Sequence, residues 1–399
     1  MTGGSCSTNT GEVQLSERED RNGTGRHPVW ALGLMSGTSM DGVDAALVRT
    51  DGVEITALGP AMTQAYYPEV RARLRDAVAG DTDEEEIGAV ERLITDHHGA
   101  VAARLLELWR AEAGCAATPA VIGFHGHTLW HRPQEGKTRQ IGDGSRLAGL
   151  TNVPVVDDFR SADMASGGEG APLAPLYHAA KLRSVDVPYP VCIVNLGGVA
   201  NVTWIAAANL DLQQDTAGIL AFDTGPASAF LDDWTEAHTG LLFDEGGALA
   251  AQGRVDDLVL AQLLADPYFA APPPKSLDRA GFDVSAVAGL GAADGAATLT
   301  EFSAQALARA GDFLPQVPKA WFTTGGGRHN RVLMNAIGGA LEAAIRPVED
   351  LEWNGDVLEA EAFAFLAVRS LYGLPLSLPA TTGADHPVAG GQLHRPGHV

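Results

Sequence analysis

The sequence predicts an α/β protein built from layers of sheets and helices. Three observations lead to this prediction: short apolar runs that are typical of buried strands, glycine- or aspartate-bearing turns that follow them, and longer segments with apolar residues at helical spacing. Strands that alternate with helices in this way are characteristic of α/β layers. With 399 residues, of which 45% are hydrophobic, the chain is long enough for two domains with sizeable cores.

The first predicted strands form a hairpin-like pair. Residues 29–35 are a short apolar run, a turn rich in Gly, Ser and Thr follows, and residues 43–49 are a second run. Residues 67–80 and 84–113 have helical periodicity, and the sequence at 81–83 (Asp-Thr-Asp) supplies capping residues for the second helix. The first part of the chain is therefore predicted to place two strands before two helices.

Further strands are predicted where an apolar run ends in a polar or glycine-rich turn. They cover residues 120–124, 153–156, 191–196, 199–205 and 320–323. A helix is predicted for residues 330–345, directly after a glycine turn, and a last helix for residues 357–372. Because ligands bind at strand ends in open α/β sheets, the turns after these strands are the candidate functional sites.

Charge and cysteine content limit the partners and the location. The formal net charge is −23, so the chain should repel nucleic acid and anionic membranes. No apolar run reaches the ~18 residues of a membrane-spanning helix. The cysteines are Cys6, Cys115 and Cys192, an odd number that suits a reducing cytosol better than a disulfide framework. We therefore predict a cytoplasmic protein, with residues 1–27 as a disordered polar extension.

The turn between the first two predicted strands has the composition of a phosphate-binding loop. Residues 33–44 read GLMSGTSMDGVD. Small residues let backbone N–H groups approach a phosphate, and Asp41 or Asp44 could hold Mg²⁺ directly or through water. A plain β-turn explains the same composition. A Walker-type loop is excluded, because the only Gly-Lys-Thr, at residues 136–138, has His131 where the first glycine should be.

At this point the sequence resembles a known family, the anhydro-N-acetylmuramic acid kinases, within the superfamily of sugar kinases, actin and the Hsp70 ATPase domain. The match begins with MSGTSMDGVDAALV and continues in order over about residues 30–393, through GFHGHTLWH, QIGD, VVDDFRSADMASGGEGAPLAP, NLGGVANVT, FDTGPASAFLDDW, DPYFAAPPPKS, TGGGRHN and GDVLEAEAFAFLA. The resemblance implies a two-domain actin-like ATPase (ribonuclease H-like) fold with a central inter-domain cleft. It also implies that ATP phosphorylates O6 of anhydro-N-acetylmuramic acid while water attacks C1 and opens the 1,6-anhydro bond.

The second motif, residues 158–173, supplies the candidate catalytic groups. Asp163 is the predicted general base, which takes a proton from the water that attacks the anomeric carbon. Arg160 is expected to lie beside it and keep its pKa low, and Asp158 is the alternative base. Because O6 receives a phosphoryl group instead of a proton, one carboxylate can suffice where an inverting glycosidase needs two. An ordinary loop with a local Asp–Arg pair is the competing interpretation.

The third motif, residues 125–131, contains three histidines. Three imidazoles within seven residues suggest zinc, but no cysteine or second ligand cluster at metal spacing supports that interpretation. A sugar-contacting loop at a strand end is favoured instead, with Trp130 offering a stacking face. The residues predicted to bind the sugar are His125, His127, Gly168, Asp223 and Thr224.

The remaining turns are assigned to ATP and Mg²⁺ by the resemblance. The residues predicted to bind the nucleotide are Gly37, Thr38, Ser39, Met40, Asp41, Gly42, Val43, Asp44, Gly197, Gly198, Asn201, Gly325, Gly326, Gly327 and Glu359. Asp41 and Asp223 are the predicted Mg²⁺ ligands. Simple turns at residues 197–198 and 223–226, strand–helix packing at residues 325–327, and a solvated helix charge at Glu359 are the alternatives.

Four positions depart from the family pattern, all on the sugar side. His127 and Glu169 stand where the family has glutamine, Ser228 stands where it typically has asparagine, and Ala280 stands where it has glutamate. The departures motivate an alternative function, a catalytically weak sugar-binding or regulatory member of the same fold. An actin- or chaperone-like ATPase with a protein partner is less favoured, because the second and third motifs suggest a small-molecule pocket.

The predicted domains are residues 28–156 and 157–399, with the C-terminal segment packing back on the first domain. ATP and Mg²⁺ are expected between the domains, with the sugar beside the γ-phosphate, and domain closure is expected to exclude water. A homodimer is predicted from the resemblance alone.

Overall fold

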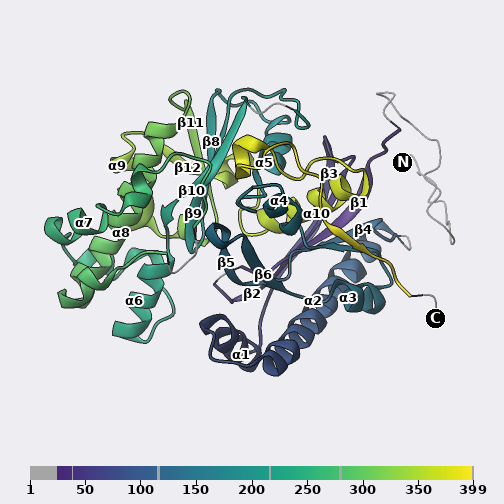
Figure 1. Cartoon of the computed structure of the whole chain (residues 1–399), viewed down its shortest axis with the longest axis horizontal. Coiled ribbons are helices and arrows are strands. Elements are labelled where there is room, and N and C mark those ends of the chain that lie inside the picture. The colour runs from purple at the N-terminus through teal and green to yellow at the C-terminus, as the bar shows by residue number, and fades with distance from the viewer. Residues whose placement is uncertain (1–24, 38, 115–116, 215–216, 278–280, 398–399) are drawn as a thin grey trace.

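The computed structural model describes residues 25–37, 39–114, 117–214, 217–277 and 281–397. Two large sheets dominate this part of the chain, with helices around and between them (Figure 1). Residues 1–24 of the predicted disordered extension lie outside the described residues. No helix in these ranges combines the length and apolar character needed to cross a membrane.

The first sheet is built mainly from the N-terminal part of the chain. Its strand order is β13-β7-β4-β1-β2-β3. The strands are β1 (Val29–Met35), β2 (Gly42–Thr50), β3 (Ile55–Ala65), β4 (Val121–Phe124), β7 (Val155–Asp157) and β13 (Gln392–His394). β1, β2 and β3 are antiparallel to one another, whereas β4 runs parallel to β1 and β7 runs parallel to β4. β13, from the end of the chain, pairs antiparallel with β7.

The second sheet repeats this plan in the order β10-β9-β8-β11-β12. The strands are β8 (Val191–Leu196), β9 (Val199–Ile205), β10 (Ile219–Pro226), β11 (Ala320–Thr324) and β12 (Ile345–Pro347). β8, β9 and β10 are antiparallel neighbours, and β11 and β12 continue the sheet in parallel on the other side of β8. In both sheets the first strand in sequence therefore lies between an antiparallel meander and two parallel strands. This duplicated α/β arrangement confirms the predicted actin-like fold class.

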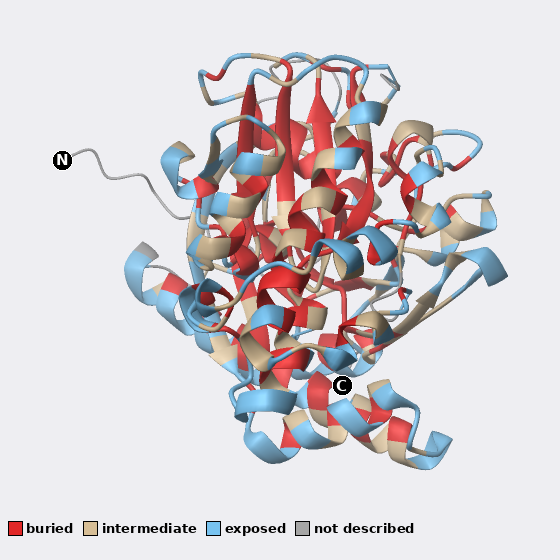
Figure 2. Cartoon of the chain, turned by 90° about the vertical axis from the view of Figure 1, so that its left-hand side faces the viewer, coloured by how far each residue is buried: buried red, intermediate tan, exposed pale blue. Residues whose placement is uncertain are grey.

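Helices cover the outer faces of the sheets and fill the space between them (Figure 1). The larger helices are α1 (Pro68–Ala79), α2 (Glu84–Ala113), α3 (Gly144–Thr151), α5 (Pro175–Leu182), α6 (Ala229–Thr239), α7 (Asp257–Leu263), α8 (Ala292–Ala310), α9 (Arg331–Ala340) and α10 (Leu358–Leu371). One core cluster joins residues of both sheets to α5 and α10, and two others lie under α1–α3 and under α8–α9. Buried residues concentrate on the strands, and exposed residues on the outer sides of the helices (Figure 2).

Two glycines let α10 lie directly on the first sheet. A Cβ at Gly33 of β1 would come within 1.8 Å of the Ala360 carbonyl oxygen, and a Cβ at Gly123 of β4 within 2.1 Å of the Phe363 carbonyl oxygen. Only glycine can be accommodated at such a close backbone approach. The C-terminal helix therefore packs on the N-terminal sheet, although the division into domains at residue 156 stays a prediction.

Most predicted elements are found, and one helix boundary is wrong. The helix predicted for residues 330–345 ends at Ala340, and Ile345 begins β12. The helix contains Gly338 and Gly339 near its end, where glycine weakens a helix. The parallel pairing of residues 345–347 with β11 then gives these residues a better place in the sheet.

Two segments interpreted as loops or turns are strands. His127 to Arg132 forms β5, which pairs with β6 (Lys137–Ile141) in a separate hairpin. The segment 223–226 is the end of β10, where a register shift between Asp223 and Gly225 lets the strand continue through turn-forming residues. β3 and α8 were not predicted; β3 contains Gly59 and Pro60, which are unusual in strand interiors.

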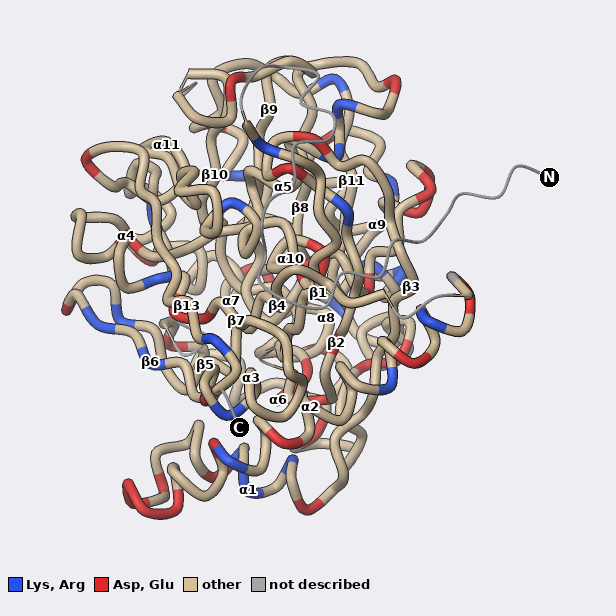
Figure 3. The backbone as a smooth tube through the Cα atoms, turned by 90° about the vertical axis from the view of Figure 1, so that its right-hand side faces the viewer, with Lys and Arg blue, Asp and Glu red and all other residues tan. Residues whose placement is uncertain are grey.

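The chain carries many more acidic than basic residues. Acidic residues outnumber basic residues, 50 to 27. Along the backbone drawn in Figure 3, the positions of Lys and Arg are scattered among those of Asp and Glu over the described residues.

Candidate active site

Asp163 is a buried carboxylate held by three neutral donors. It lies on the short helix α4 (Ser161–Ala165) and is 2% exposed. The Gly170 N–H donates to its Oδ2 at 2.7 Å, and the hydroxyls of Ser377 and Thr382 donate to its Oδ1, the latter at 2.7 Å. A carboxylate has about four lone-pair positions, so the described residues leave one on Oδ2 for a further donor. Asp163 can therefore accept a proton from a water without losing its anchors.

The glycine run after α4 makes room for this carboxylate. A Cβ at Gly168 would lie 2.2 Å from Asp163 Oδ2, which is closer than any real contact. The Gly168 N–H also donates to the Asp163 carbonyl at 3.0 Å. Gly168, predicted to bind the sugar, therefore shapes the position of Asp163.

Replacing Gly168 with alanine is expected to displace the Asp163 carboxylate and lower kcat about 100-fold, because a shift of ~1 Å in a reacting group can cost that much. Steady-state assays measure the effect. Gly149→Ala is the matched control, since a Cβ at Gly149 of α3 meets no atom within 4 Å and its rate should match the wild type. Equal rates for the two variants would contradict this role of Gly168.

Arg160 lies near Asp163, as expected, but its guanidinium donates to other groups. Its Nη1 donates to the Gly170 carbonyl at 2.6 Å and its Nη2 to His125 Nε2 at 2.8 Å. Burial lowers the Arg160 pKa, while the carboxylates of Glu359, Asp223 and Asp163 oppose this effect. The local Asp–Arg pair of the competing interpretation is not found, because the Gly170 carbonyl and the His125 imidazole occupy the guanidinium.

His125 is a neutral acceptor in this site. Burial, and then the neighbouring Arg160 charge, hold the pKa of His125 well below its usual range. Because Nε2 accepts from Arg160, the ring proton is on Nδ1, which lies 3.1 Å from the Gly126 carbonyl. The ring also packs against Phe363 of α10 in a tilted contact, at 4.6 Å between ring centroids.

Asp158 has a different environment from Asp163. It is exposed, has a φ of +48°, and its Oδ1 accepts from the Ser161 hydroxyl at 2.5 Å at the start of α4. The same oxygen accepts from the Ser161 N–H at 3.4 Å, so Asp158 supports the chain at the start of α4. The geometry favours Asp163 over Asp158 as the base.

Asp223 brings a further carboxylate toward Arg160, and Glu169 lies near Asp223. Asp223 sits at the bulge of β10, and its Oδ2 accepts from the Leu277 N–H at 2.8 Å. Burial raises its pKa to about 7; the Leu277 N–H and the Arg160 charge lower it, and Glu169 raises it. Glu169 Oε2 accepts from the Ser276 hydroxyl at 2.9 Å. Thr224, also predicted to bind the sugar, instead donates its hydroxyl to the Ala200 carbonyl at 3.3 Å.

The predicted phosphate loop is a turn with an open, polar tip. The Met40 N–H donates to the Gly37 carbonyl at 3.0 Å, and the Ser39 hydroxyl donates to Asp41 at 2.8 Å. Met40 and Val43 place their side chains in the core, so only their backbones can contact a ligand. Gly42 is required by the close approach of β2 to the Gln64 carbonyl in β3. Thr38 lies outside the described residues.

Four carboxylates gather beside this loop. Burial raises the pKa of Asp44 to about 7, the Thr63 hydroxyl opposes the shift, and the charges of Asp41, Glu359 and Asp356 add to it. Glu359 opens the first turn of α10, and burial raises its pKa as well, so it is not a solvated helix charge. Such a concentration of negative charge suits a divalent cation.

No complete metal cage is present in the described ranges. They contain no group of three His, Cys, Asp or Glu side chains placed to hold an ion, which leaves the zinc interpretation of the histidines unsupported. Mg²⁺ does not need such a cage, because it keeps several waters and is held by one or two carboxylates together with substrate phosphates. The residues therefore fit a nucleotide-bound Mg²⁺.

The turn between β8 and β9 is braced by α6. The Gly197 carbonyl accepts from the Ser228 N–H at 3.0 Å and the Ser228 hydroxyl at 3.1 Å, and the Gly198 carbonyl accepts from the Ala227 N–H at 3.0 Å. Ser228 thus supports the turn through its own side chain. Asn201, in β9, pairs with Asn195 of β8 and Asp223 of β10 in the sheet register.

In the glycine turn after β11, packing leaves no room for a side chain at two glycines, whereas the third faces open space. A Cβ at Gly325 would meet Asn195 Oδ1 at 2.4 Å, and a Cβ at Gly327 would meet the Leu196 side chain at 2.8 Å. A Cβ at Gly326 would meet no described atom within 4 Å. Strand packing therefore explains Gly325 and Gly327, while Gly326 leaves space for a ligand.

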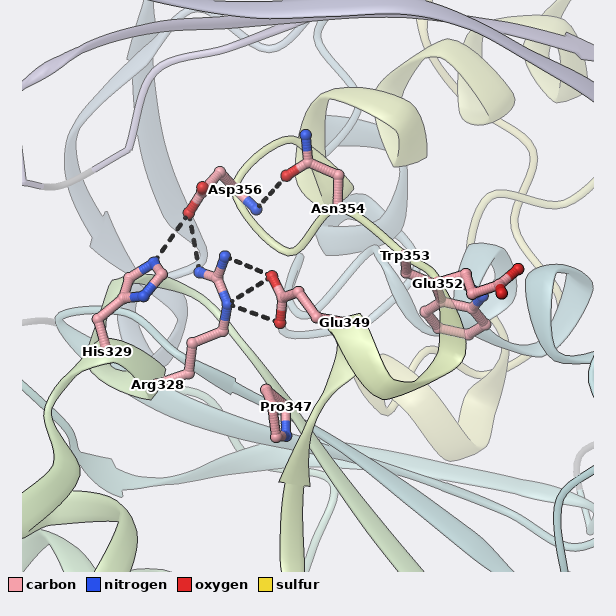
Figure 4. Close-up of a pocket in the computed structure, with 8 residues that line it drawn as sticks. All are labelled: Arg328, His329, Pro347, Glu349, Glu352, Trp353, Asn354 and Asp356. Carbon is pink, nitrogen blue, oxygen red and sulfur yellow. Dashed lines mark hydrogen bonds and ion pairs between the residues drawn. The ribbon is translucent and has the colours of Figure 1, made fainter.

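A cavity of about 610 Å³ begins beside this turn (Figure 4). Arg328 projects between two acidic residues: it contacts Glu349 at 2.7 Å and Asp356 at 2.8 Å. Trp353 and Pro347 line other parts of the wall. The charge of Asp356 also raises the pKa of Asp44, so this cavity adjoins the four carboxylates at the phosphate loop.

His127 belongs to a separate buried network. Its Nδ1 lies 3.0 Å from the Ser36 hydroxyl, which accepts from the Tyr66 hydroxyl at 2.9 Å. Burial lowers its pKa to about 4. The Ser36 end of this network belongs to the start of the phosphate loop. His125 and His127 do not lie in one loop, because β5 begins at His127, and the two side chains have different partners. Contact of either histidine with the sugar stays a prediction.

Several site residues were missed in the sequence. Ser377 and Thr382 contact Asp163 from more than 200 positions away, and Tyr268 donates to the Asp223 carbonyl at 2.6 Å. His131 was noticed only as part of the histidine motif, yet burial and then the Arg160 charge lower its pKa to about 4. No local pattern marks the first three; only the order of the motifs could have suggested them.

Comparison with known proteins identifies the family. The family model described as anhydro-N-acetylmuramic acid kinase matches residues 29–395. A protein of that name from Rhodospirillum rubrum is 49% identical over 365 residues, 91% of this chain and 93% of the relative. One from Gluconobacter oxydans is 51% identical over 371 residues, 91% and 99% of the two chains. Among solved structures, a ROK family glucokinase from Streptomyces griseus in complex with glucose and AMPPNP is 15% identical, with a TM-score of 0.36 over 85% of this chain and 99% of the other. The extent of the family match shows that the chain belongs to the anhydro-N-acetylmuramic acid kinase family.

Proposed function

We propose that the protein is an ATP-dependent kinase that converts anhydro-N-acetylmuramic acid, water and ATP into N-acetylmuramic acid 6-phosphate and ADP. Family membership supports the reaction class. The single observation that carries the mechanism is Asp163, a buried carboxylate with fixed orientation and one lone-pair position left by the described residues.

In the proposed reaction, Asp163 Oδ2 accepts a proton from water as the water oxygen bonds to C1. The bond between C1 and the bridging oxygen breaks, and its electron pair stays on that oxygen, O6. O6 then bonds to the γ-phosphorus as the bond to ADP breaks. Arg160 and the neutral His125 orient the sugar, and Asp223 accepts a hydrogen bond from it.

ATP is proposed to span the phosphate loop and the glycine turn. Backbone N–H groups at Gly37 and Ser39 and in the 197–198 turn face the phosphates, and adenosine occupies the cavity beside Gly326 and Arg328. Mg²⁺ is proposed to bind at Asp41 and Asp44, near Glu359. Asp223, the other predicted Mg²⁺ ligand, is assigned to the sugar instead, because its carboxylate lies near Arg160. When bound, it neutralises charge on the phosphates during transfer. A homodimer and a cytoplasmic location remain parts of this proposal.

A direct assay tests the function. The protein is incubated with ATP, Mg²⁺ and anhydro-N-acetylmuramic acid, and ADP and N-acetylmuramic acid 6-phosphate are quantified together. The proposal expects equal amounts of both. ADP without phosphosugar would indicate an ATPase, and sugar binding without turnover would favour a regulatory protein.

A further inference from the structure

A segment far from β10 in the sequence holds Asp223 in place. The Asp223 N–H donates to the Lys275 carbonyl at 2.9 Å, and the Tyr268 hydroxyl donates to the Asp223 carbonyl at 2.6 Å. The Leu277 N–H donates to Asp223 Oδ2 at 2.8 Å. Residues 268–277, the clamp segment, thus fix both backbone groups and one carboxylate oxygen of Asp223.

The bulge in β10 explains why Asp223 needs such support. The register between β9 and β10 shifts between Asp223 and Gly225. A bulge interrupts the regular ladder and redirects the side chain, so its orientation depends on other partners. Here the clamp segment supplies those partners, and Oδ1 of Asp223 has no hydrogen bond to a described residue.

Lys275 anchors the clamp segment by its ammonium group. The side chain is 8% exposed, and Nζ lies 4.4 Å from the Tyr268 ring centroid, 4.9 Å from that of Phe313 and 5.9 Å from that of Phe222. Nζ also donates to the Tyr268 carbonyl at 2.8 Å. Aromatic faces attract a cation, and a desolvated cation more strongly than an exposed one. The cage therefore ties Lys275 to the same tyrosine that holds Asp223.

The clamp segment reaches a second carboxylate through Ser276, which lies between Lys275 and Leu277. The Ser276 hydroxyl donates to Glu169 Oε2 at 2.9 Å. Glu169 in turn lies in the glycine run that surrounds Asp163, and its N–H donates to the Thr382 carbonyl at 2.6 Å. Asp223 and the run beside the base are thus set by one segment.

We propose that Tyr268 and Lys275 are positioning residues that aim Asp223 Oδ1 at a sugar hydroxyl; this inference rests on the proposed function. Neither side chain touches the reacting atoms. They act through Asp223, so their loss should weaken the use of the sugar and leave the use of ATP unchanged.

The test compares Tyr268→Phe, which removes only the hydroxyl, with the wild type. We expect kcat/KM for anhydro-N-acetylmuramic acid to fall about tenfold, because one well-placed hydrogen bond is lost. KM for ATP should stay within about twofold of the wild-type value. Lys275→Met should act in the same direction. Tyr372→Phe is the matched control, because its hydroxyl also donates to a backbone carbonyl, that of His27 at 2.8 Å, far from the site in sequence.

A double variant separates positioning from general stability. If Tyr268 acts through Asp223, Tyr268→Phe should have no further effect on kcat/KM in an Asp223→Asn background. Additive losses, equal losses for ATP and sugar, or wild-type kinetics of Tyr268→Phe would overturn the proposal. If the wild type does not turn over the sugar, the proposed function fails, and calorimetric sugar binding by the same variants decides the inference.

Discussion

Asp163→Asn is expected to lower kcat by about 10²–10⁴-fold, the usual contribution of a general base, and to leave the Kd for ATP within about twofold. The amide keeps the shape of the side chain and can still accept from Ser377 and Thr382, but it cannot take a proton from water. The ATP-binding group proposed at Asp41 and Asp44 is formed by other elements and should be unaffected. Product formation and calorimetric ATP binding provide the two readouts.

Asp158→Asn is the control for this prediction. Asp158 is exposed and accepts a hydrogen bond from Ser161 at the start of α4, so the variant should retain most of the wild-type kcat. If Asp163→Asn kept near wild-type turnover and Asp158→Asn lost it, Asp158 would be the base and Asp163 would not.

Lys181→Met is expected to lower the free energy of unfolding by about 3–5 kcal/mol, the cost of leaving one partner of a buried ion pair uncompensated. Lys181 on α5 and Glu361 on α10 form an ion pair in which both residues are 4% exposed. Tyr177 donates a further hydrogen bond to Glu361 at 2.5 Å. The chain neighbours of both residues, among them Leu182 and Ala360, belong to the core cluster that joins the two sheets, so an unpaired charge here lies beside that core.

The double variant Lys181→Met/Glu361→Leu is the matched comparison. Replacing both charges with apolar groups removes the unpaired carboxylate and should restore much of the lost stability. Urea unfolding measures all three proteins. If Lys181→Met were as stable as the wild type, the pair would contribute nothing to stability. If the double variant lost as much stability as Lys181→Met, the loss would not come from an unpaired charge. Either result would contradict the assignment of a buried electrostatic contact.

Much of the fold follows from local sequence. Residues 81–83 were predicted to cap the second helix, and the Asp83 side chain accepts from the Glu86 N–H at its start. The strands that end in glycine turns were also found, because an apolar run followed by Gly-Gly has few other structures. The end of α9 and the strand β12 could not be predicted, since residues 345–347 become a strand only by pairing with β11.

The sequence identified the main residues of the candidate site but not the groups with which they form hydrogen bonds. Asp163 was singled out from its motif, yet the hydroxyls that hold it come from Ser377 and Thr382 at the other end of the chain. Arg160 was predicted to lie beside Asp163, but its hydrogen bonds to His125 and Gly170 were not predicted, because such partners depend on packing between elements. Lys181 and Glu361 carry no signal in sequence, since each looks like an ordinary charge on an amphipathic helix.

In the proposed reaction, water attacks C1 while the phosphoryl group goes to O6. Isotope tracing distinguishes these two steps: the reaction is run in ¹⁸O-enriched water and quenched early, and the phosphosugar is fragmented in a mass spectrometer. We expect one ¹⁸O at C1 and none in the phosphoryl group. An ¹⁸O label in phosphate, or an unlabelled C1, would contradict the proposed reaction.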